Sequence, residues 1–224
     1  MRRAIPAIAG AMLALSPVAP AISQDSVPPS ESPPPAGTYR LDTLHASIIV
    51  HVNHMGFSRY PVRFTEFDIQ MEFDPAAPED MSVTAEIDPA SLETHYPRDD
   101  VDFDAQLTGA QWLDVENHPV IRFVSSDVTL TGENTAQVAG TLSLMGIEQP
   151  LTLDVTYNGG YAGMVPYDPQ ARIGFSATAA FDRSAFGLVY GIPAEGSSFG
   201  VADRVTVNIE AELLGPALAG AAEE

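Results

Sequence analysis

The chain has 224 residues, with 30 acidic side chains against 10 arginines and no lysine, and a formal net charge of −20. A negative field of this size repels nucleic acids and anionic lipid surfaces, which argues against both as general partners. The chain has no cysteine, which excludes disulfides and a lipid anchor attached through a thiol.

The N-terminal residues 1–23 have the pattern of a secretory signal peptide. Two arginines precede an uncharged apolar run, which ends in small residues near Ser23. The run is interrupted by prolines and is too short to span a bilayer comfortably. Export without cysteine suits a bacterial periplasm. We therefore expect a periplasmic protein, cleaved near Ser23, with no stable membrane insertion after the signal is removed.

Three further segments follow from composition. Residues 24–36 are rich in proline, serine and acid and predict a disordered spacer. Residues 37–214 contain nothing that resembles a linker, so we expect them to form one domain. Residues 215–224 predict a flexible tail.

Alternation of apolar and polar side chains runs through the domain. It begins in residues 45–54, and residues 55–61 predict a turn because they contain glycine, serine and proline. In residues 67–73 every second side chain is apolar, so the strand has one oily and one acidic face. Phe64 has the wrong spacing for this face, which predicts a bulge near Thr65.

The pattern continues to the end of the domain, with one interruption. Residues 83–87 predict the next strand, whereas residues 91–117 are polar and do not alternate. Within them Leu107, Trp112 and Leu113 have spacings that a short helix over a barrel end would use. Strands are predicted again around residues 121–130, 138–144, 151–157, 173–179 and 205–211.

About eight strands with apolar faces predict an all-β fold, an eight-stranded antiparallel lipocalin-like barrel with a short helical insertion. A barrel of eight strands is either filled by side chains or holds one small ligand. Small inward residues at Ala85, Gly140, Ala177 and Ala179 favour a cavity. The ligand-binding residues that we predict are Ile48, Val50, Val52, Phe67, Ile69, Met71, Phe73, Phe175 and Ala177.

Catalytic and metal-binding patterns are weak. His45 and His51 share a strand face but lie about 20 Å apart, too far for one metal ion. There is no G-x-S-x-G elbow and no phosphate loop. For Arg183, a structural ion pair with Asp182 or Asp203 is expected. We predict no catalytic residues, no metal, no cofactor and no enzymatic activity.

Five segments in order resemble the YceI-like family of exported bacterial proteins: YRLDTLHASIIVHVNHMGFS, FTEFDIQMEFDP, AQLTGAQWLDVENHPVIRFVSS, VAGTLSLMGIEQPLTLDV and GFSATAAFDRSAFGL. The resemblance runs from about Tyr39 to Leu213. It implies a lipocalin-like barrel whose apolar tunnel holds a long isoprenoid chain, either a polyisoprenoid or an isoprenoid quinone, and no established catalytic activity.

The charge of the chain limits which head group we expect the ligand to have. A phosphate head group would need a local group of arginines, whereas a quinone would not, so we expect a neutral isoprenoid. Two alternatives stay open. One is an acidic stress-response or interaction module that uses the barrel as a scaffold. The other is a lipid-modifying enzyme, which would need His45 or His54 beside a carboxylate inside the tunnel. A homodimer is also open.

Overall fold

The computed structural model describes residues 32–164 and 167–218. The expected signal peptide and most of the expected spacer lie outside these residues. Within them no helix has the length and apolar character of a membrane span.

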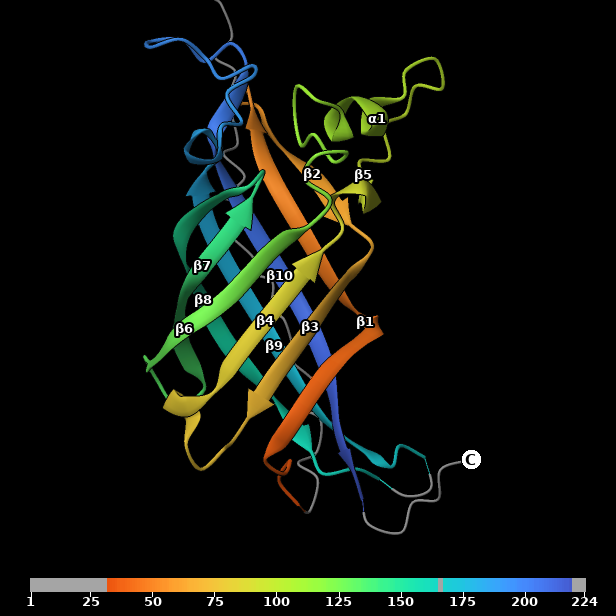
Figure 1. Ribbon diagram of the computed structural model, residues 1–224, viewed down its shortest axis with the longest axis vertical. Coiled ribbons are helices and arrows are strands. Elements are labelled where there is room, and N and C mark those ends of the chain that lie inside the picture. The colour runs from red at the N-terminus through yellow and green to blue at the C-terminus, as the bar shows by residue number, and fades with distance from the viewer. Residues whose placement is uncertain (1–31, 165–166, 219–224) are drawn as a thin grey trace, which may run out of the picture.

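Ten strands form one antiparallel sheet, which is drawn in Figure 1. Their bounds are β1 (Gly37–His54), β2 (Ser58–Phe64), β3 (Phe67–Phe73), β4 (Ser82–Ile87), β5 (Leu92–Glu93), β6 (Ile121–Leu130), β7 (Thr135–Leu144), β8 (Ile147–Tyr161), β9 (Gln170–Asp182) and β10 (Val201–Ala217). The helix α1 (Phe103–Thr108) and three short 3-10 helices, η1 (Pro78–Asp80), η2 (Pro89–Ser91) and η3 (Arg183–Phe186), lie between strands.

The sheet closes because β1 pairs with both β3 and β10. The closed ring contains eight strands in the order β1, β3, β4, β6, β7, β8, β9 and β10, and every pairing is antiparallel. This confirms the predicted eight-stranded barrel. The short strands β2 and β5 are additions, because β2 pairs with the second half of β1 and β5 pairs with β2. They lengthen the wall at the end of the barrel where α1 lies (Figure 1).

The predicted bulge near Thr65 is instead a break between two strands. The predicted turn at 55–61 is shorter than expected, since β2 already begins at Ser58. The chain then leaves β2 at Phe64 and starts β3 at Phe67. Ser91 fills the gap, because its carbonyl accepts from the Thr65 amide and hydroxyl and its hydroxyl accepts from the Glu66 amide. These contacts come from a distant segment, so the local sequence does not reveal them.

Three other boundaries differ from those predicted. Residues 147–150 belong to β8, in which Pro150 pairs with Thr141, and β8 continues to Tyr161. β10 continues to Ala217, which pairs with Gln170, so the first residues of the expected tail are in a strand. The helix contains Leu107 but ends before Trp112 and Leu113, because Gly109 caps it.

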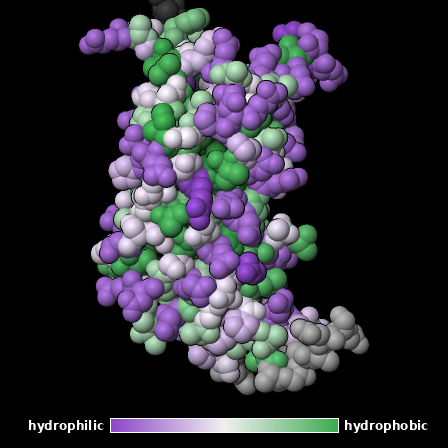
Figure 2. Space-filling model, in the orientation of Figure 1, coloured by the Kyte–Doolittle hydropathy of each residue, from purple (hydrophilic) through white to green (hydrophobic). Residues whose placement is uncertain are grey.

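Residues on the inward face pack into three apolar clusters. One lies around Tyr39 and Phe73, one around Phe123 and Phe186, and one around Ile48 and Phe64 beneath α1. The outward face is polar, as expected for a sheet with one face in water. Figure 2 shows hydrophilic residues over much of the visible surface, particularly around the α1 projection at the upper right.

Candidate functional site

An apolar cavity of about 680 Å³ lies inside the barrel, between α1 and the middle of the strands. It receives side chains from the second half of β1 and from β2, from the α1 ends of the other barrel strands, and from the insertion. Its volume is in the range of sites that bind a drug-sized ligand. The residues around it are Ile48, Val50, Val52, His54, Tyr60, Val62, Phe64, Ile69, Ala85, Ile87, Leu92, Tyr96, Phe103, Leu107, Trp112, Leu113, Ile121, Phe123, Leu142, Leu144, Leu151, Leu153, Ala179, Phe181, Arg183, Leu188, Val201, Val205, Val207 and Ile209.

Four of the nine predicted ligand-binding residues lie along this cavity. Ile48, Val50 and Val52 line it from β1, and Ile69 lines it from β3. Strand alternation places these side chains inward, and the register aligns Ile48 with Ile209 of β10.

The other five predicted residues pack away from the cavity, on the same inward faces. Phe73 and the half-buried Met71 and Phe175 belong to the cluster around Tyr39. Phe67 is half-buried and packs between that cluster and the one around Ile48. Ala177 is buried beside Ile209 and Val155, one step deeper than the lining residue Ala179.

The small inward residues differ in whether they border the cavity. Ala85 and Ala179 border the cavity, and their short side chains leave its space open. At Gly140 the space is filled instead, because an added Cβ would lie 2.5 Å from the Phe123 ring. The sequence shows where a large side chain is missing, but it does not show whether a neighbouring side chain fills the space.

Aromatic residues of the insertion line one side of the cavity. Phe103 of α1 lies 4.9 Å from Tyr96 and 6.1 Å from Tyr60 of β2, measured between ring centroids. Trp112, half-buried, lies 5.3 Å from Tyr190 in an edge-on arrangement. The insertion thus supplies part of the cavity wall and not only a cover for the barrel end.

Arg183 is the one permanently charged residue among the described lining residues. Its side chain is 4% exposed and donates to three backbone carbonyls, to Leu188 at 2.6 Å, Val201 at 2.9 Å and Ala202 at 3.0 Å. The expected ion pair with Asp182 or Asp203 is wrong. Asp203 instead accepts from the Ser184 amide and hydroxyl, and Arg204 pairs with Asp182.

The buried environment of Arg183 disfavours the charged form of its guanidinium. Burial lowers the pKa of its guanidinium, and the nearby Asp203 opposes that change. The cation also lies over the Trp112 ring, an arrangement that stabilises a partly desolvated charge. The hydrogen bonds and the stacking on Trp112 both hold the Arg183 side chain in place in the cavity wall.

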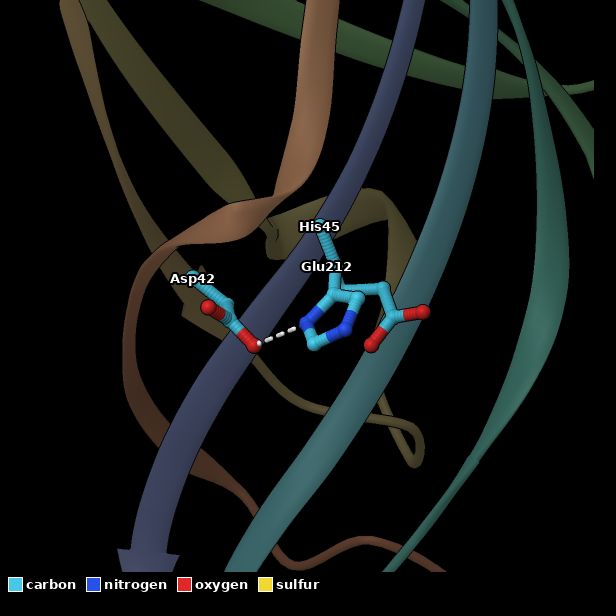
Figure 3. A group of neighbouring side chains, drawn as sticks. All are labelled: Asp42, His45 and Glu212. Atoms are coloured by element: carbon cyan, nitrogen blue, oxygen red, sulfur yellow. Dashed lines mark hydrogen bonds and ion pairs between the residues drawn. The ribbon is translucent and has the colours of Figure 1, made fainter.

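A cluster of polar residues lies outside the cavity, at an irregular part of β1. Leu41 pairs with Leu213 but Ala46 pairs with Ala211, so residues 42–45 bulge opposite Glu212. Asp42 accepts from His45 Nδ1 at 2.8 Å, and Figure 3 shows this contact beside Glu212. The three residues are close enough to hold a metal ion.

Arg172 of β9 already binds the two carboxylates of this group. Its Nη1 donates to Asp42 at 2.5 Å and to Glu212 at 2.6 Å, and its Nε donates to Asp168 at 3.1 Å. Burial raises the pKa of Asp42, but the hydrogen bonds from His45 and Arg172 outweigh it and lower that pKa to about 2. A metal ion would have to displace the guanidinium, so we interpret the group as an ion-pair network that fastens the bulge.

Neither histidine forms the catalytic pair that a lipid-modifying enzyme would need. His45 is beside a carboxylate but is not among the cavity residues, and His54 borders the cavity. The described lining residues include no aspartate or glutamate. The geometry therefore offers a place to bind an apolar molecule, without an acid and base converging on it.

Comparisons with known proteins agree on the fold. The family model of the YceI-like domain matches residues 39–213. A UPF0312 protein of Pseudomonas putida strain W619 is 34% identical over 155 residues, which are 68% of this chain and 77% of that protein.

Two solved structures have the same architecture. The crystal structure of Burkholderia cenocepacia BcnA is similar with a TM-score of 0.63 and 24% identity, over 77% of this chain and 98% of that one. A polyisoprenoid binding domain from Saccharophagus degradans, implicated in plant cell wall breakdown, is similar with a TM-score of 0.53 and 14% identity, over 80% of this chain and 98% of that one. At these identities the likeness concerns the fold.

Proposed function

Because the chain belongs to the YceI-like family, we propose that it is a binding protein that carries an isoprenoid lipid in its barrel cavity, and not an enzyme. The observation that carries the proposal is the apolar cavity of about 680 Å³. Burial of apolar surface stabilises by about 25 cal/mol per Å², so a few isoprene units contribute several kcal/mol before the costs of ordering. The polyisoprenoid-binding neighbour supports this class of ligand.

The polar groups around the cavity favour a neutral head group. Arg183 is the one arginine of the described lining residues, and it already donates to three carbonyls. A phosphate carries more than one charge and binds best to several cationic donors, whereas the described lining residues include a single arginine. A quinone carbonyl needs one donor, such as the hydroxyl of Tyr60 or Tyr96, and the quinone ring can stack against an aromatic ring such as Trp112.

The proposed setting is the bacterial periplasm, where such a carrier would move its lipid between membranes or enzymes. This part rests on the pattern of residues 1–23, which lie outside the described residues. Fractionation of cells that express the full chain, with N-terminal sequencing of the mature protein, tests it. A mature protein in the cytoplasm with an intact N-terminus would contradict it.

Native mass spectrometry of the protein purified from its own host tests the ligand. We expect an added mass that matches an isoprenoid quinone or another neutral isoprenoid. A polyprenyl phosphate would overturn the neutral head group and leave the carrier role standing. The carrier role would fail if the protein came out empty and also failed to bind any added isoprenoid.

Trp112 gives a second measurement. It is the one tryptophan of the chain and it lines the cavity, so its fluorescence should report occupancy directly. Titration with a short-chain ubiquinone should quench the emission and saturate. Quenching that rises without saturation would indicate collisions with free quinone and would argue against a bound state.

A further inference from the structure

The hairpin formed by β1 and β2 borders the cavity with one face and carries positive charge on the other. Tyr60 and Val62 of β2 line the cavity. Strand alternation turns Arg59 and Arg63 to the opposite face, where both are exposed. Neither arginine side chain has an ion pair or hydrogen bond with any described residue. Other arginines are paired with carboxylates: Arg98, Arg122, Arg172 and Arg204. The hairpin therefore keeps two cations available to a partner.

The charge of the hairpin differs from that of the rest of the chain. Residues 43–65 contain no aspartate or glutamate, although the chain has 30 acidic side chains. In the strand register Arg59 lies opposite Asn53, whereas Arg63 lies opposite Glu93 of β5. Charges more than about 8 Å away are largely screened at physiological ionic strength. The net charge argues against anionic surfaces as general partners, but a surface that meets the hairpin encounters its local positive charge first.

Two exposed aromatic side chains lie at the same end of the barrel. Phe57, in the turn between β1 and β2, is 86% exposed, and Phe199, just before β10, is 79% exposed. The two turns are joined, because the Met55 amide donates to the Gly200 carbonyl at 3.0 Å. A single exposed apolar residue is ordinary, but two on joined turns form an apolar tip. Phenylalanine beside arginine suits the boundary between lipid head groups and acyl chains.

The cavity reaches the surface beside this tip. His54 lines the cavity and is exposed, and it directly precedes the turn that contains Phe57. Val201, which follows Gly200, also lines the cavity. A surface that contacts Phe57 would therefore lie next to the entrance of the cavity.

We propose that the β1–β2 hairpin docks this protein reversibly on an anionic phospholipid surface, with Phe57 entering the head-group region and Arg59 and Arg63 binding lipid phosphates. Two arginines and few aromatic rings give weak attachment, so the protein can leave the surface again. The docking adds a partner to the proposed function, and its purpose rests on that function: it brings the cavity entrance to the membrane that holds the isoprenoid. A membrane fits better than an acidic protein because the cations lie beside exposed phenylalanine at an apolar entrance.

Sedimentation with lipid vesicles tests the docking. The protein purified from its own host is mixed with vesicles of phosphatidylcholine alone or with about 30% phosphatidylglycerol. We expect binding to the vesicles with phosphatidylglycerol and release by high salt, which screens the arginines. Arg59→Ala combined with Arg63→Ala should weaken binding about twentyfold. Phe57→Ser should weaken it about tenfold, because an apolar ring no longer leaves water.

The matched controls lie at the other end of the barrel. Arg40 is an exposed arginine near the start of β1, and it has no carboxylate partner among the described residues. Tyr167, between β8 and β9, is 85% exposed, nearly as much as Phe57. Arg40→Ala and Tyr167→Ser should change vesicle binding less than about twofold, since neither residue touches the docked surface. Losses equal to those of the hairpin variants would overturn the role of the hairpin.

The docking and the carrier function can fail separately. Titration with a short-chain ubiquinone in the absence of vesicles should be unchanged in the hairpin variants, because Phe57, Arg59 and Arg63 are not lining residues. Native protein that binds ubiquinone but no anionic vesicle would overturn the docking and leave the carrier function standing. Native protein that binds anionic vesicles through the hairpin but no isoprenoid would overturn the carrier function alone.

Two further results would contradict the proposed partner. Equal binding to vesicles with and without phosphatidylglycerol would overturn the role of the arginines. Soluble polyglutamate that binds as tightly as the anionic vesicles, with no loss in Phe57→Ser, would assign the hairpin to an acidic protein in place of a membrane.

Discussion

The guanidinium of Arg183 lies over the indole of Trp112, with its central carbon 5.4 Å from the ring centroid. This contact joins the residues after β9 to the insertion that follows β5, two segments far apart in the chain. Both residues border the cavity. The contact therefore fixes the insertion against the barrel wall.

Replacing Arg183 with Met should destabilise the fold. The carbonyls of Leu188, Val201 and Ala202 would lose their donor, and an unsatisfied buried polar group is costly, so we expect a loss of about 2–4 kcal/mol in the free energy of unfolding. Urea denaturation measures it. Arg204→Met is the control, because its ion pair with Asp182 is exposed and should contribute less than about 1 kcal/mol. Equal losses would contradict the assigned role.

Tryptophan at position 179 should block the cavity and keep the fold. Ala179 borders open space, so the large ring replaces volume that the ligand needs. Ala177 is buried without bordering that space, and Ala177→Trp should cost at least about 1–3 kcal/mol through overpacking. Binding of geranylgeraniol and thermal unfolding are measured for both variants. A ligand affinity in Ala179→Trp equal to that of the native protein would place the ligand elsewhere.

Asp42 should make the fold sensitive to acid. Its pKa falls from an ordinary value of 3.8 to about 2 in the folded protein, so folding favours the ionised form. That stabilisation is complete above about pH 5 and is lost as the pH falls through 2, and its size is about 2 kcal/mol. Asp42→Asn should be less stable at pH 7 and should lose less stability between pH 4 and pH 2. An unchanged acid dependence in urea titrations would contradict the network.

Tyr39 should make the fold sensitive to alkali in the opposite sense. Burial, with a smaller effect of Tyr157, raises the pKa of its hydroxyl to about 12 from an ordinary value of 10. Folding favours the protonated form, so this stabilisation is complete below pH 10 and is lost as the pH rises through 12. In Tyr39→Phe the free energy of unfolding should therefore fall less steeply between pH 10 and pH 12 than in the native protein. The Tyr absorbance change of the native protein should coincide with unfolding.

Sequence patterns predicted the barrel because alternation is a local property of each strand. The apolar side chains at every second position of residues 67–73 fix which face turns inward, whatever the neighbouring strand is. The break at Thr65 could not be predicted in the same way, since the groups that satisfy its amide and hydroxyl belong to Ser91. The cavity-lining role of Trp112 was missed for a similar reason: it depends on how the insertion folds over the barrel.

The sequence by itself determined that this protein has an all-β domain with an apolar inward face and an acidic outward one. Only the tertiary structure decided which inward side chains border a cavity and which fill the barrel. Ala179 and Ala177 are both small and inward on one strand, yet only Ala179 borders the cavity, whereas Ala177 is buried beside Val155 of β8 and Ile209 of β10. Packing of that kind depends on several strands at once, so no single segment of the sequence contains it.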